Sequence, residues 1–307
     1  MLHIHFHADC DGVVSAYFFV KELERLSIPY RLHPSLGASV KFTRGLNIGL
    51  DISDVKAEKK ENLVIDHHIT SRFNLFHVNP RFSGFEWPVS FLSYVLFGNE
   101  SESWIAAVGV VADWCAEKVP KGFWEIVRSR YPSLVNSLKQ EKLVKGPLGR
   151  MAFMIDSSIA VDRQDGAIYA LEALRSAESP MEFLEGRGKA KRLKKLAEKI
   201  ETEVEQVFGN ELVTEKFVLL KFSSKYRIKS LVAARAREKY RKKLVVIAQE
   251  EGDKIRLSFR GGEGLDRLVK ELTRGIGSGG GHEKASGGWV YREKWNEFRR
   301  RLFEKFK

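Results

Sequence analysis

Histidine and aspartate side chains gather at four places near the amino terminus, in each case where an apolar run ends. The four clusters are His7-Ala8-Asp9-Cys10-Asp11, Asp51, Asp66-His67-His68 and Asp113. Carboxylates suit hard divalent cations, and admixed imidazole favours Mn²⁺, with Mg²⁺ as the alternative. Two such cations that share a carboxylate can activate water for attack on a phosphoester. The pattern therefore predicts a two-metal site for phosphoester hydrolysis.

The residue types suggest how the ligands divide between the two cations. Asp9 and Asp11 could each face one metal, and Asp51, at the end of its own run, is the natural bridge. His67 would bind through one ring nitrogen, with Asp66 or a backbone group fixing its tautomer. Asp113 could complete the second metal. An aspartate at the end of a strand or helix is often only a cap, so the prediction rests on the clusters jointly.

Three histidines alternate along the first predicted strand. His3, His5 and His7 share one strand face by their spacing, and a histidine there is ordinarily structural. We expect His7 to be a ligand, keep His5 as a second candidate, and regard His3 as structural.

Apolar periodicity predicts an α/β fold in the first half of the chain. Strands are expected at residues 2–7, 46–50 and 63–65, and helices at 13–26, 88–97 and 102–111. Such alternation favours a parallel sheet, in which reactive groups collect beyond the carboxyl ends of the strands. Residues 177–209 are rich in Lys, Glu and Arg and predict a long exposed helix that links two domains.

The second half predicts a smaller mixed α/β unit. Its expected strands are 212–222, 244–249, 254–259 and 289–291, and its helices are 230–240, 265–273 and 295–306. A glycine-rich loop at Gly279-Gly280-Gly281 could let backbone amides approach an anion, although such runs are often only linkers. His282, Lys284 and Arg260 flank it, and a guanidinium can donate two hydrogen bonds to a phosphate. Phe222, Tyr226 and Trp289 could stack on a base but are more often core residues.

Bulk properties narrow the class of protein. The 307 residues hold 52 Lys and Arg against 40 Asp and Glu, a net charge of +12, which suits a polyanionic partner but also a surface rich in ion pairs. The longest apolar stretch is too short to span a membrane and no secretory signal is evident, so a cytoplasmic protein without a membrane partner is expected. Two cysteines are too few for a disulfide framework.

These motifs resemble a known family. His7-Ala8-Asp9-Cys10-Asp11-Gly12, Asp51-Ile52-Ser53, Asp66-His67-His68 and Gly109-Val110-Val111-Ala112-Asp113 resemble, in order and spacing, the four motifs of the DHH phosphoesterase superfamily. Ser258-Phe259-Arg260 and Gly279-Gly280-Gly281-His282 resemble the substrate-binding DHHA1 domain of RecJ-like exonucleases and nanoRNases. The resemblance implies that Asp9, Asp11, Asp51, His67 and Asp113 bind metal and that His68 contacts the scissile phosphate.

The resemblance leaves the histidine ligand open. RecJ-like members usually carry Asp at the position of His7, whereas pyrophosphatase-like members carry His at the position of His5. The glycine-histidine motif separates this chain from those pyrophosphatases, whose smaller domain is of another type.

The expected protein is a parallel-sheet DHH catalytic domain (1–176), a helical linker (177–209) and a DHHA1 substrate-binding domain (210–307). Its expected activity is 3′-to-5′ exonuclease action on single-stranded DNA or RNA, with His68 and Arg260 stabilising charge on the phosphate and Arg260, Gly279, Gly280, Gly281 and His282 binding substrate. The alternatives are a nanoRNase or a 3′-phosphoadenosine 5′-phosphate phosphatase, and a catalytically silent replication scaffold. A replication-fork or repair helicase is a candidate partner, and self-association is left open.

Overall fold

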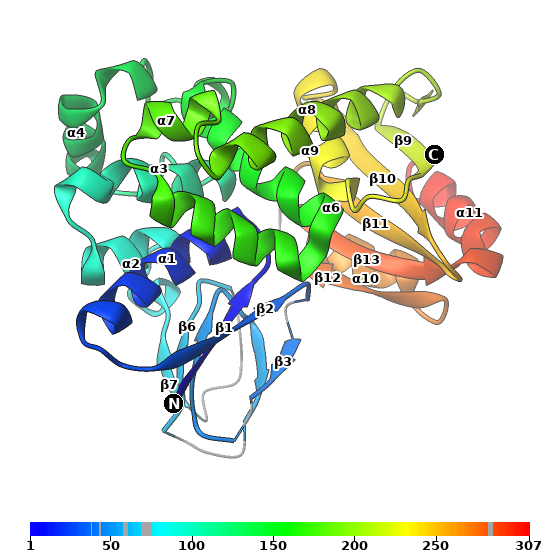
Figure 1. The fold of residues 1–307 in the computed structure, drawn as a ribbon. Helices are drawn as coiled ribbons and strands as arrows, with labels where there is room; N and C mark the ends of the chain where they lie inside the picture. Colours follow the sequence, from blue (N-terminus) through cyan, green and yellow to red (C-terminus); the bar gives the residue numbers. More distant parts are fainter. Residues whose placement is uncertain (38, 43, 58–60, 69–74, 282–284) are drawn as a thin grey trace. The chain divides into compact units, whose positions relative to one another are not determined.

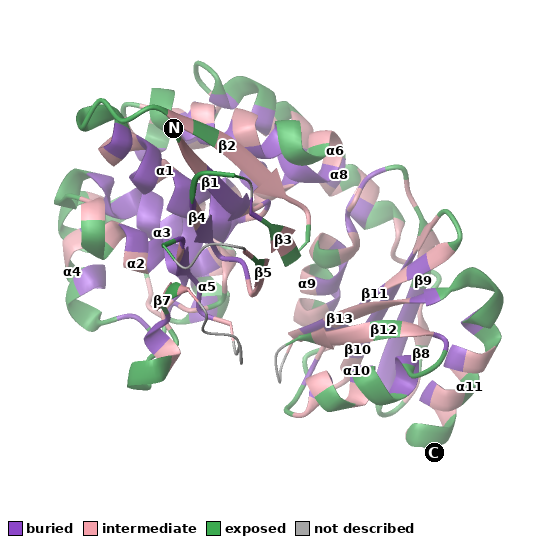
Figure 2. Ribbon diagram, turned by 90° about the horizontal axis from the view of Figure 1, so that it is seen from below, coloured by how far each residue is buried: buried purple, intermediate pink, exposed green. Residues whose placement is uncertain are grey.

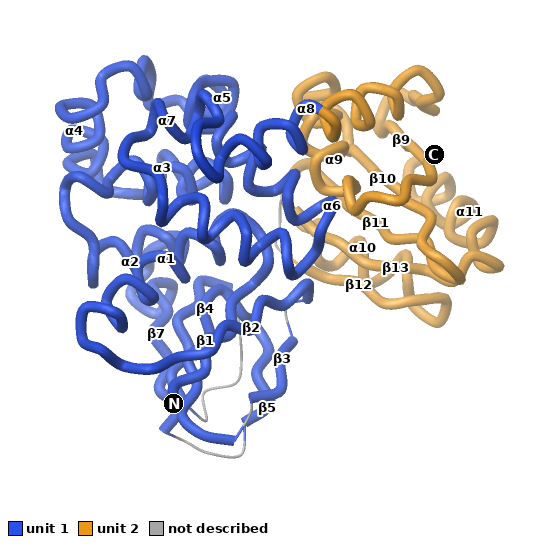
Figure 3. The backbone as a smooth tube through the Cα atoms, in the orientation of Figure 1, with its two compact units in different colours: residues 1–198 blue, residues 199–307 orange. Residues whose placement is uncertain are grey.

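The structure, a computed structural model, describes the whole chain apart from residues 38, 43, 58–60, 69–74 and 282–284. It divides into two compact units, residues 1–198 and 199–307 (Figure 3). Each unit has its own sheet and its own hydrophobic core. The division falls inside helix α8 (Ala190–Gln206), within the helical segment expected between the two domains.

A five-stranded parallel sheet forms the first unit, in the order β2-β1-β4-β6-β7 (Figure 1). Ile4, Phe6 and Leu50 on the central strands are fully buried, as expected of short apolar strands in a covered parallel sheet. Figure 2 shows buried residues along both β1 and β4. The bounds are β1 (Leu2–His7), β2 (Tyr30–Ser35), β4 (Leu46–Leu50), β6 (Leu63–Ile65) and β7 (Phe76–Val78). A separate parallel pair is formed by β3 (Ser39–Lys41) and β5 (Asp54–Lys56).

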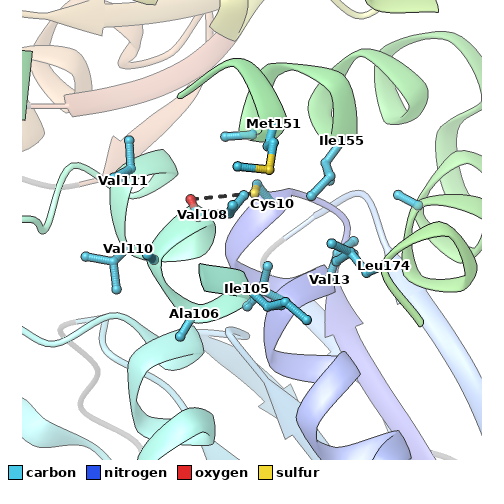
Figure 4. Packing of buried hydrophobic residues seen from close by; sticks show 14 of the residues in the cluster. Cys10, Val13, Ile105, Ala106, Val108, Val110, Val111, Met151, Ile155 and Leu174 are labelled. Atoms are coloured by element: carbon cyan, nitrogen blue, oxygen red, sulfur yellow. Dashed lines mark hydrogen bonds between the residues drawn. The ribbon is translucent and has the colours of Figure 1, made fainter. Parts of the chain in front are cut away.

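Helices complete the core of this unit. Val13 of α1, Val108 of α3 and Ile155 of α6 converge in it (Figure 4), and each such buried aliphatic side chain stabilises the unit by about 1.5–3 kcal/mol. A Cβ added to Gly109 would lie 2.5 Å from the Ser90 side chain, so only glycine lets α3 approach α2 this closely. The bounds are α1 (Cys10–Arg25), α2 (Val89–Phe97), α3 (Ser103–Ala112), α4 (Lys121–Arg130), α5 (Gln140–Val144), α6 (Pro147–Ser176) and α7 (Pro180–Glu185), with short 3₁₀ turns η1 (Pro80–Ser83), η2 (Glu100–Glu102) and η3 (Pro132–Leu134).

A six-stranded mixed sheet forms the second unit, in the order β12-β13-β11-β10-β9-β8. Only β9 and β10 pair in parallel. Helices α10 and α11 pack on one face through Val269 and Phe298, and α9 packs against β10 and β11. The bounds are β8 (Leu212–Val213), β9 (Phe217–Ser223), α9 (Lys229–Lys239), β10 (Leu244–Glu251), β11 (Lys254–Arg260), α10 (Leu265–Thr273), β12 (Gly277–Gly281), β13 (Ala285–Tyr291), η4 (Arg292–Lys294) and α11 (Trp295–Lys305).

Two predicted elements differ from the structure. Residues 177–209 do not form one exposed helix, because α7 ends at Gly186 in the left-handed conformation and α8 begins only at Ala190. Leu193 and Ile200, on the apolar stripe of α8, are fully buried. The glycine run 279–281 is not a loop but lies in strand β12, which pairs with a β13 that begins earlier than expected.

The fold class predicted from the sequence is otherwise confirmed: a parallel-sheet α/β unit, a smaller mixed unit and a helical segment between them. Within the described residues, none of the helices has the length and apolar character needed to cross a bilayer.

Candidate metal centre

The predicted ligands follow three neighbouring strands of the first sheet. Strands β1, β4 and β6 are parallel and adjacent, with Phe6 opposite Leu50 and Leu50 opposite Ile65. Their carboxyl ends therefore meet at one edge of the sheet, and the next residues in the chain come together there. Asp51, which follows the central strand of the three, lies between the His7 and His67 segments.

A tight turn joins β1 to α1 and fixes the first motif. The Asp9 carboxylate accepts a hydrogen bond from the Gly12 backbone N–H at 3.0 Å and caps the helix. A Cβ at Gly12 would lie 2.0 Å from the His7 carbonyl oxygen, so this position requires glycine. The turn thereby holds His7, Asp9 and Asp11 close to the end of β1.

Among the described residues, three groups of side chains have ligand atoms within 4.8 Å of one another and could each hold a metal ion. They are His7, Asp9 and Asp51; Asp11, His67 and Asp113; and Asp51, His67 and His68. The groups overlap at Asp51 and His67, and His67 Nε2 lies 3.4 Å from Asp51 Oδ1. Every ligand predicted from the sequence except His5 is therefore found in one cluster, which includes His68 as well.

The contacts between members of the cluster are short. His7 Nδ1 lies 2.7 Å from Asp9 Oδ2 and 3.4 Å from Asp51 Oδ2. His67 Nδ1 lies 3.6 Å from Asp113 Oδ2. These separations suit side chains that share one or two cations, and carboxylate and imidazole are the ligand types that Mn²⁺ accepts.

Asp11 is anchored by a second helix. Its two carboxylate oxygens accept hydrogen bonds from the backbone N–H groups of Val89 and Ser90, each at 3.0 Å, at the start of α2. Unpaired N–H groups at a helix start favour a negative charge. Asp113 directly follows α3, and Cys115 Sγ donates to its carboxylate at 3.3 Å.

The electrostatics of the cluster favour cations. Burial raises the pKa of Asp11 well above its ordinary value, and the charges of Asp51 and Asp113 add to this effect. Burial likewise raises the pKa of Asp113, against the opposing charge of His67. For Asp51 burial also acts upward, but interactions with the His67 and His7 side chains outweigh it and lower the pKa. Carboxylates gathered away from water repel one another unless a positive charge lies among them.

On the histidines of the cluster, burial acts in the opposite direction to its effect on the carboxyl groups. Burial acts to lower the pKa of His7, but Asp9 and Asp51 outweigh it and hold the pKa well above 6.5. The pKa of His67 is raised in the same way, with Asp113 and Asp51 outweighing burial. Asp51 Oδ1 is buried without a hydrogen-bond partner among the described residues, an orphaned acceptor that a cation would satisfy. The residues present thus fit a divalent metal.

Asp66 orients His68 rather than His67, which corrects the role predicted for it. The fully buried Asp66 accepts from His68 Nδ1 at 2.7 Å and from the His68 backbone N–H at 3.2 Å. Since a carboxylate only accepts, Nδ1 is the donor, and Nε2 is the other ring position available for chemistry. Burial acts to lower the pKa of His68, but Asp66 and Asp51 raise it overall.

His5 lies away from the cluster. Its Nε2 is hydrogen-bonded to Asn47 Oδ1 at 2.9 Å, and its ring stacks on His33 with centroids 4.6 Å apart. Burial lowers the pKa of His5 to about 4, against the Asn47 hydrogen bond. His3 pairs with His33 at 2.9 Å. Of the two candidate histidines, the structure brings His7 and not His5 to the carboxylates.

Strained backbone marks the site. Asp51 and Trp114 have φ of 57° and 58°, in the left-handed region that residues other than glycine rarely adopt. One is a predicted ligand and the other directly follows Asp113. Strain of about 1–3 kcal/mol per residue persists only where the surroundings impose it, and it gathers at functional sites.

Sequence reasoning missed Asp156. This carboxyl group, on α6, accepts a hydrogen bond from the Cys10 backbone N–H at 3.0 Å and so supports the turn that carries Asp9 and Asp11. Burial raises its pKa to about 7, and the charge of Asp9 acts in the same direction. Asp156 lies inside a long helix with no neighbouring motif, so the sequence offers no signal for it.

The predicted substrate-binding residues belong to the second unit. Arg260, at the end of β11, donates to Ser258 Oγ and to the Phe259 carbonyl oxygen, each at 3.0 Å. Gly279, Gly280 and Gly281 lie in β12, opposite Gly288, Gly287 and Ser286 of β13. His282, also predicted to bind substrate, and the neighbouring Lys284 lie outside the described residues.

Comparison with known proteins gives a family match for most of the second unit and similar folds for the whole chain. Residues 214–307 match the family model described as the DHHA1 domain. Curated proteins give no match. Among solved structures, RecJ from Thermus thermophilus in complex with Mn²⁺ is similar with a TM-score of 0.67 and 15% identity over 98% of this chain and 51% of that one. This chain therefore spans about half the length of that RecJ.

Two further structures are similar over nearly the whole chain. An exonuclease RecJ bound to manganese gives a TM-score of 0.62 and 15% identity, covering 98% of this chain and 88% of that one. A DHH domain described as a member of the s1p family of ribosomal proteins gives 0.67 and 16%, covering 99% and 86%. These findings show a DHHA1 domain at residues 214–307 and a fold of the whole chain that is similar to that of RecJ proteins.

Proposed function

We propose that this chain is a metal-dependent phosphodiesterase that removes nucleotides from the 3′ end of single-stranded DNA or RNA. The observation that carries the proposal is the convergence of six predicted ligands at the ends of β1, β4 and β6 and after α3. These residues are His7, Asp9, Asp11, Asp51, His67 and Asp113. The RecJ neighbours were solved with Mn²⁺, and the Thermus protein also with Mg²⁺, which supports these ions as the cofactors.

The geometry suggests how the ligands divide. His7 and Asp9 face Asp51 from one side, and His67 links Asp51 to Asp11 and Asp113 on the other. Asp51 is accordingly the bridging carboxylate in our proposal. Two bound Mn²⁺ ions, or Mg²⁺ as the alternative, would activate a water molecule and neutralise charge on the phosphate.

The remaining residues bind and orient the substrate. His68, held by Asp66, donates a hydrogen bond to an oxygen of the scissile phosphate, where negative charge develops. In this proposal Arg260 and the backbone of Gly279, Gly280 and Gly281 bind the terminal nucleotide, and the same role is assigned to His282, which lies outside the described residues. In the reaction the water oxygen bonds to phosphorus, the P–O3′ bond breaks, and the departing O3′ takes up a proton. The products are a nucleoside 5′-monophosphate and a chain shortened by one nucleotide.

The net charge of +12 supports a polymeric substrate, because each additional backbone contact releases counterions and strengthens binding. Such binding weakens as salt is added. Activity on a long strand should therefore fall with ionic strength more steeply than activity on a dinucleotide.

The experiment is hydrolysis of DNA and RNA strands labelled at either end, in Mn²⁺, with Asp51→Asn purified in parallel to exclude contaminating nuclease. We expect stepwise release of monophosphates from the 3′ end by the wild-type chain alone. Cleavage confined to substrates of two to five nucleotides, or to 3′-phosphoadenosine 5′-phosphate, would replace the exonuclease with the short-substrate alternatives. Equal hydrolysis by both proteins, or none by either, would contradict a catalytic site here and favour the scaffold.

A further inference from the structure

One face of the second sheet carries a half-buried, positively charged surface beside helix α9, here called the shelf, with Lys229 and Arg260 as its cations. Residues directly opposite one another in an antiparallel pair share a face, so Ser258 and Arg260 of β11 lie on the same side as Gly287 and Ala285 of β13. Leu257 and Phe259, which alternate with them, belong to the core on the other side. At this part of the shelf β13 itself contributes no side chain at Gly287 and only a methyl group at Ala285.

Lys229, the first residue of α9, reaches over this shelf. Its Nζ donates to the Leu257 carbonyl oxygen at 3.0 Å and would lie 3.8 Å from a Cβ added to Gly287. Its backbone N–H is held by Gln249 Oε1 at 2.9 Å, so the start of the helix is fixed against β10. Contacts within the fold therefore hold the Lys229 amine in place, unlike that of a lysine whose side chain moves freely in solvent.

The two cations next to Gly287 lack a direct carboxylate partner among the described residues. Among the residues that the structure describes, neither Lys229 nor Arg260 forms an ion pair, and their hydrogen bonds go to carbonyl and hydroxyl oxygens. By contrast, Arg256 on the same face is paired with Glu251 at 2.7 Å. Two half-buried cations kept apart from acids repel one another, and an anion bound between them removes that cost.

We propose that Lys229 is a positioning residue for substrate, which together with Arg260 binds a phosphate group over Gly287. The proposal rests on the phosphoesterase function proposed above for the identity of the anion, and it adds a residue that the motifs do not include. A phosphate is the class of ligand expected because it can accept from an ammonium and a guanidinium at once.

The pKa of the Lys229 amine supports a role in phosphate binding. Burial, followed by the charges of Arg260, Arg227 and Arg256, lowers the pKa of Lys229 to about 8, while Glu251 acts in the opposite direction. A bound phosphate would raise the pKa again. The affinity for a phosphate dianion should therefore weaken as the pH rises through 8, because the free protein must then take up a proton to bind.

The test is binding of adenosine 5′-monophosphate to the full chain without metal, measured by calorimetry in EDTA. Lys229→Gln should weaken binding by about tenfold or more, since a charged hydrogen bond is lost, while adenosine binding stays unchanged. Lys225→Gln removes an exposed lysine four residues earlier and should change the affinity by about twofold at most. Equal affinities of Lys229→Gln and wild type would overturn the proposal.

A second measurement does not depend on the folding of that variant. Between pH 7 and pH 9 the phosphate remains a dianion, so wild-type affinity should weaken by about tenfold, whereas Lys229→Arg should lose this dependence. A wild-type affinity that is constant over this range would overturn the proposal. Inorganic phosphate in place of the nucleotide shows whether the phosphate alone suffices. Because metal is excluded, this measurement tests nucleotide binding separately from hydrolysis. Loss of the Lys229 proposal would therefore leave the proposed phosphodiesterase activity untouched, and loss of that activity would leave nucleotide binding untouched.

Discussion

Two histidines on one face of strand β1 lie in different surroundings. Inside the strand, His5 contacts Asn47, His33 and Phe42, and burial holds its ring neutral. At the carboxyl end His7 contacts Asp9 and Asp51, which hold its pKa well above the ordinary value. The same residue type on the same face is thus structural at one end and a candidate ligand at the other. The difference arises from the neighbouring strand β4. It places Asn47 near His5, and the residue that follows it, Asp51, lies next to His7.

The largest expected effect is on the rate of hydrolysis, and it follows from changing Asp51, the carboxylate next to His7. Asp51→Asn should lower divalent-dependent hydrolysis by more than about 100-fold, because changes to residues one shell further out already cost about 10–100-fold. Asp54→Asn, which changes a nearby carboxylate in β5 outside the cluster, should leave the rate unchanged. The assay compares initial rates at saturating Mn²⁺. Full activity of Asp51→Asn would remove the basis of the comparison.

The next effect separates the two histidines directly. His7→Ala should weaken Mn²⁺ binding by about 10–100-fold, because a ligand contact is lost. His5→Gln should leave Mn²⁺ affinity unchanged and lower only the free energy of unfolding, since the hydrogen bond between His5 Nε2 and Asn47 Oδ1 is lost. Calorimetric Mn²⁺ titration and denaturant unfolding of both variants give the two quantities. Loss of Mn²⁺ affinity in His5→Gln instead of His7→Ala would reverse the assignment.

The pH dependence of stability sharpens the same contrast. The pKa of His5 falls from 6.5 in the unfolded chain to about 4 in the fold, so its stabilising contribution is complete above pH 6.5. As the pH falls from 6.5 towards 4, the unfolded chain binds the proton first, and the free energy of unfolding falls by up to about 3 kcal/mol. His5→Gln should lack this part of the decline. Unfolding curves of equal pH dependence in both proteins would refute the neutral, buried His5.

The smallest expected effect concerns the support of the turn after β1. Asp156→Asn keeps an acceptor for the Cys10 N–H and should change Mn²⁺ affinity by about threefold or less, whereas Asp156→Ala leaves that donor unpaired and should cost about tenfold. Equal losses in the two variants would mean that the charge of Asp156, which both remove, matters and its hydrogen bond does not.

Much of the site could be predicted because its residues follow short apolar runs that can be recognised in the sequence. Short apolar runs followed at once by Asp9, Asp51 or His67 identify both the strands and their reactive ends, since parallel strands bring those ends together. The choice between His5 and His7 could not be made in this way. That choice depends on Asn47, which contacts His5, and on Asp51, which contacts His7. Both are far from the histidines in sequence and come next to them only because β4 pairs with β1.

Other features depended on tertiary contacts that leave no local signal. Gly277–Gly281 forms a strand because β13 offers it an edge to pair with, although glycine has little preference for strands. The break between α7 and α8 is set by Gly186 in the left-handed conformation, within a sequence whose charges otherwise favour a continuous helix. Lys229 and Asp156 gain their roles from the backbone groups they reach, Leu257 and Cys10.

The central claim is that two divalent cations lie among these carboxylates, and anomalous diffraction from crystals grown with Mn²⁺ tests it most directly. We predict two anomalous peaks on either side of Asp51, one near His7 and Asp9 and the other near His67 and Asp113, with His5 remote from both. Crystals with Mn²⁺ in the medium but no peak among these side chains, or with a peak at His5, would contradict the account.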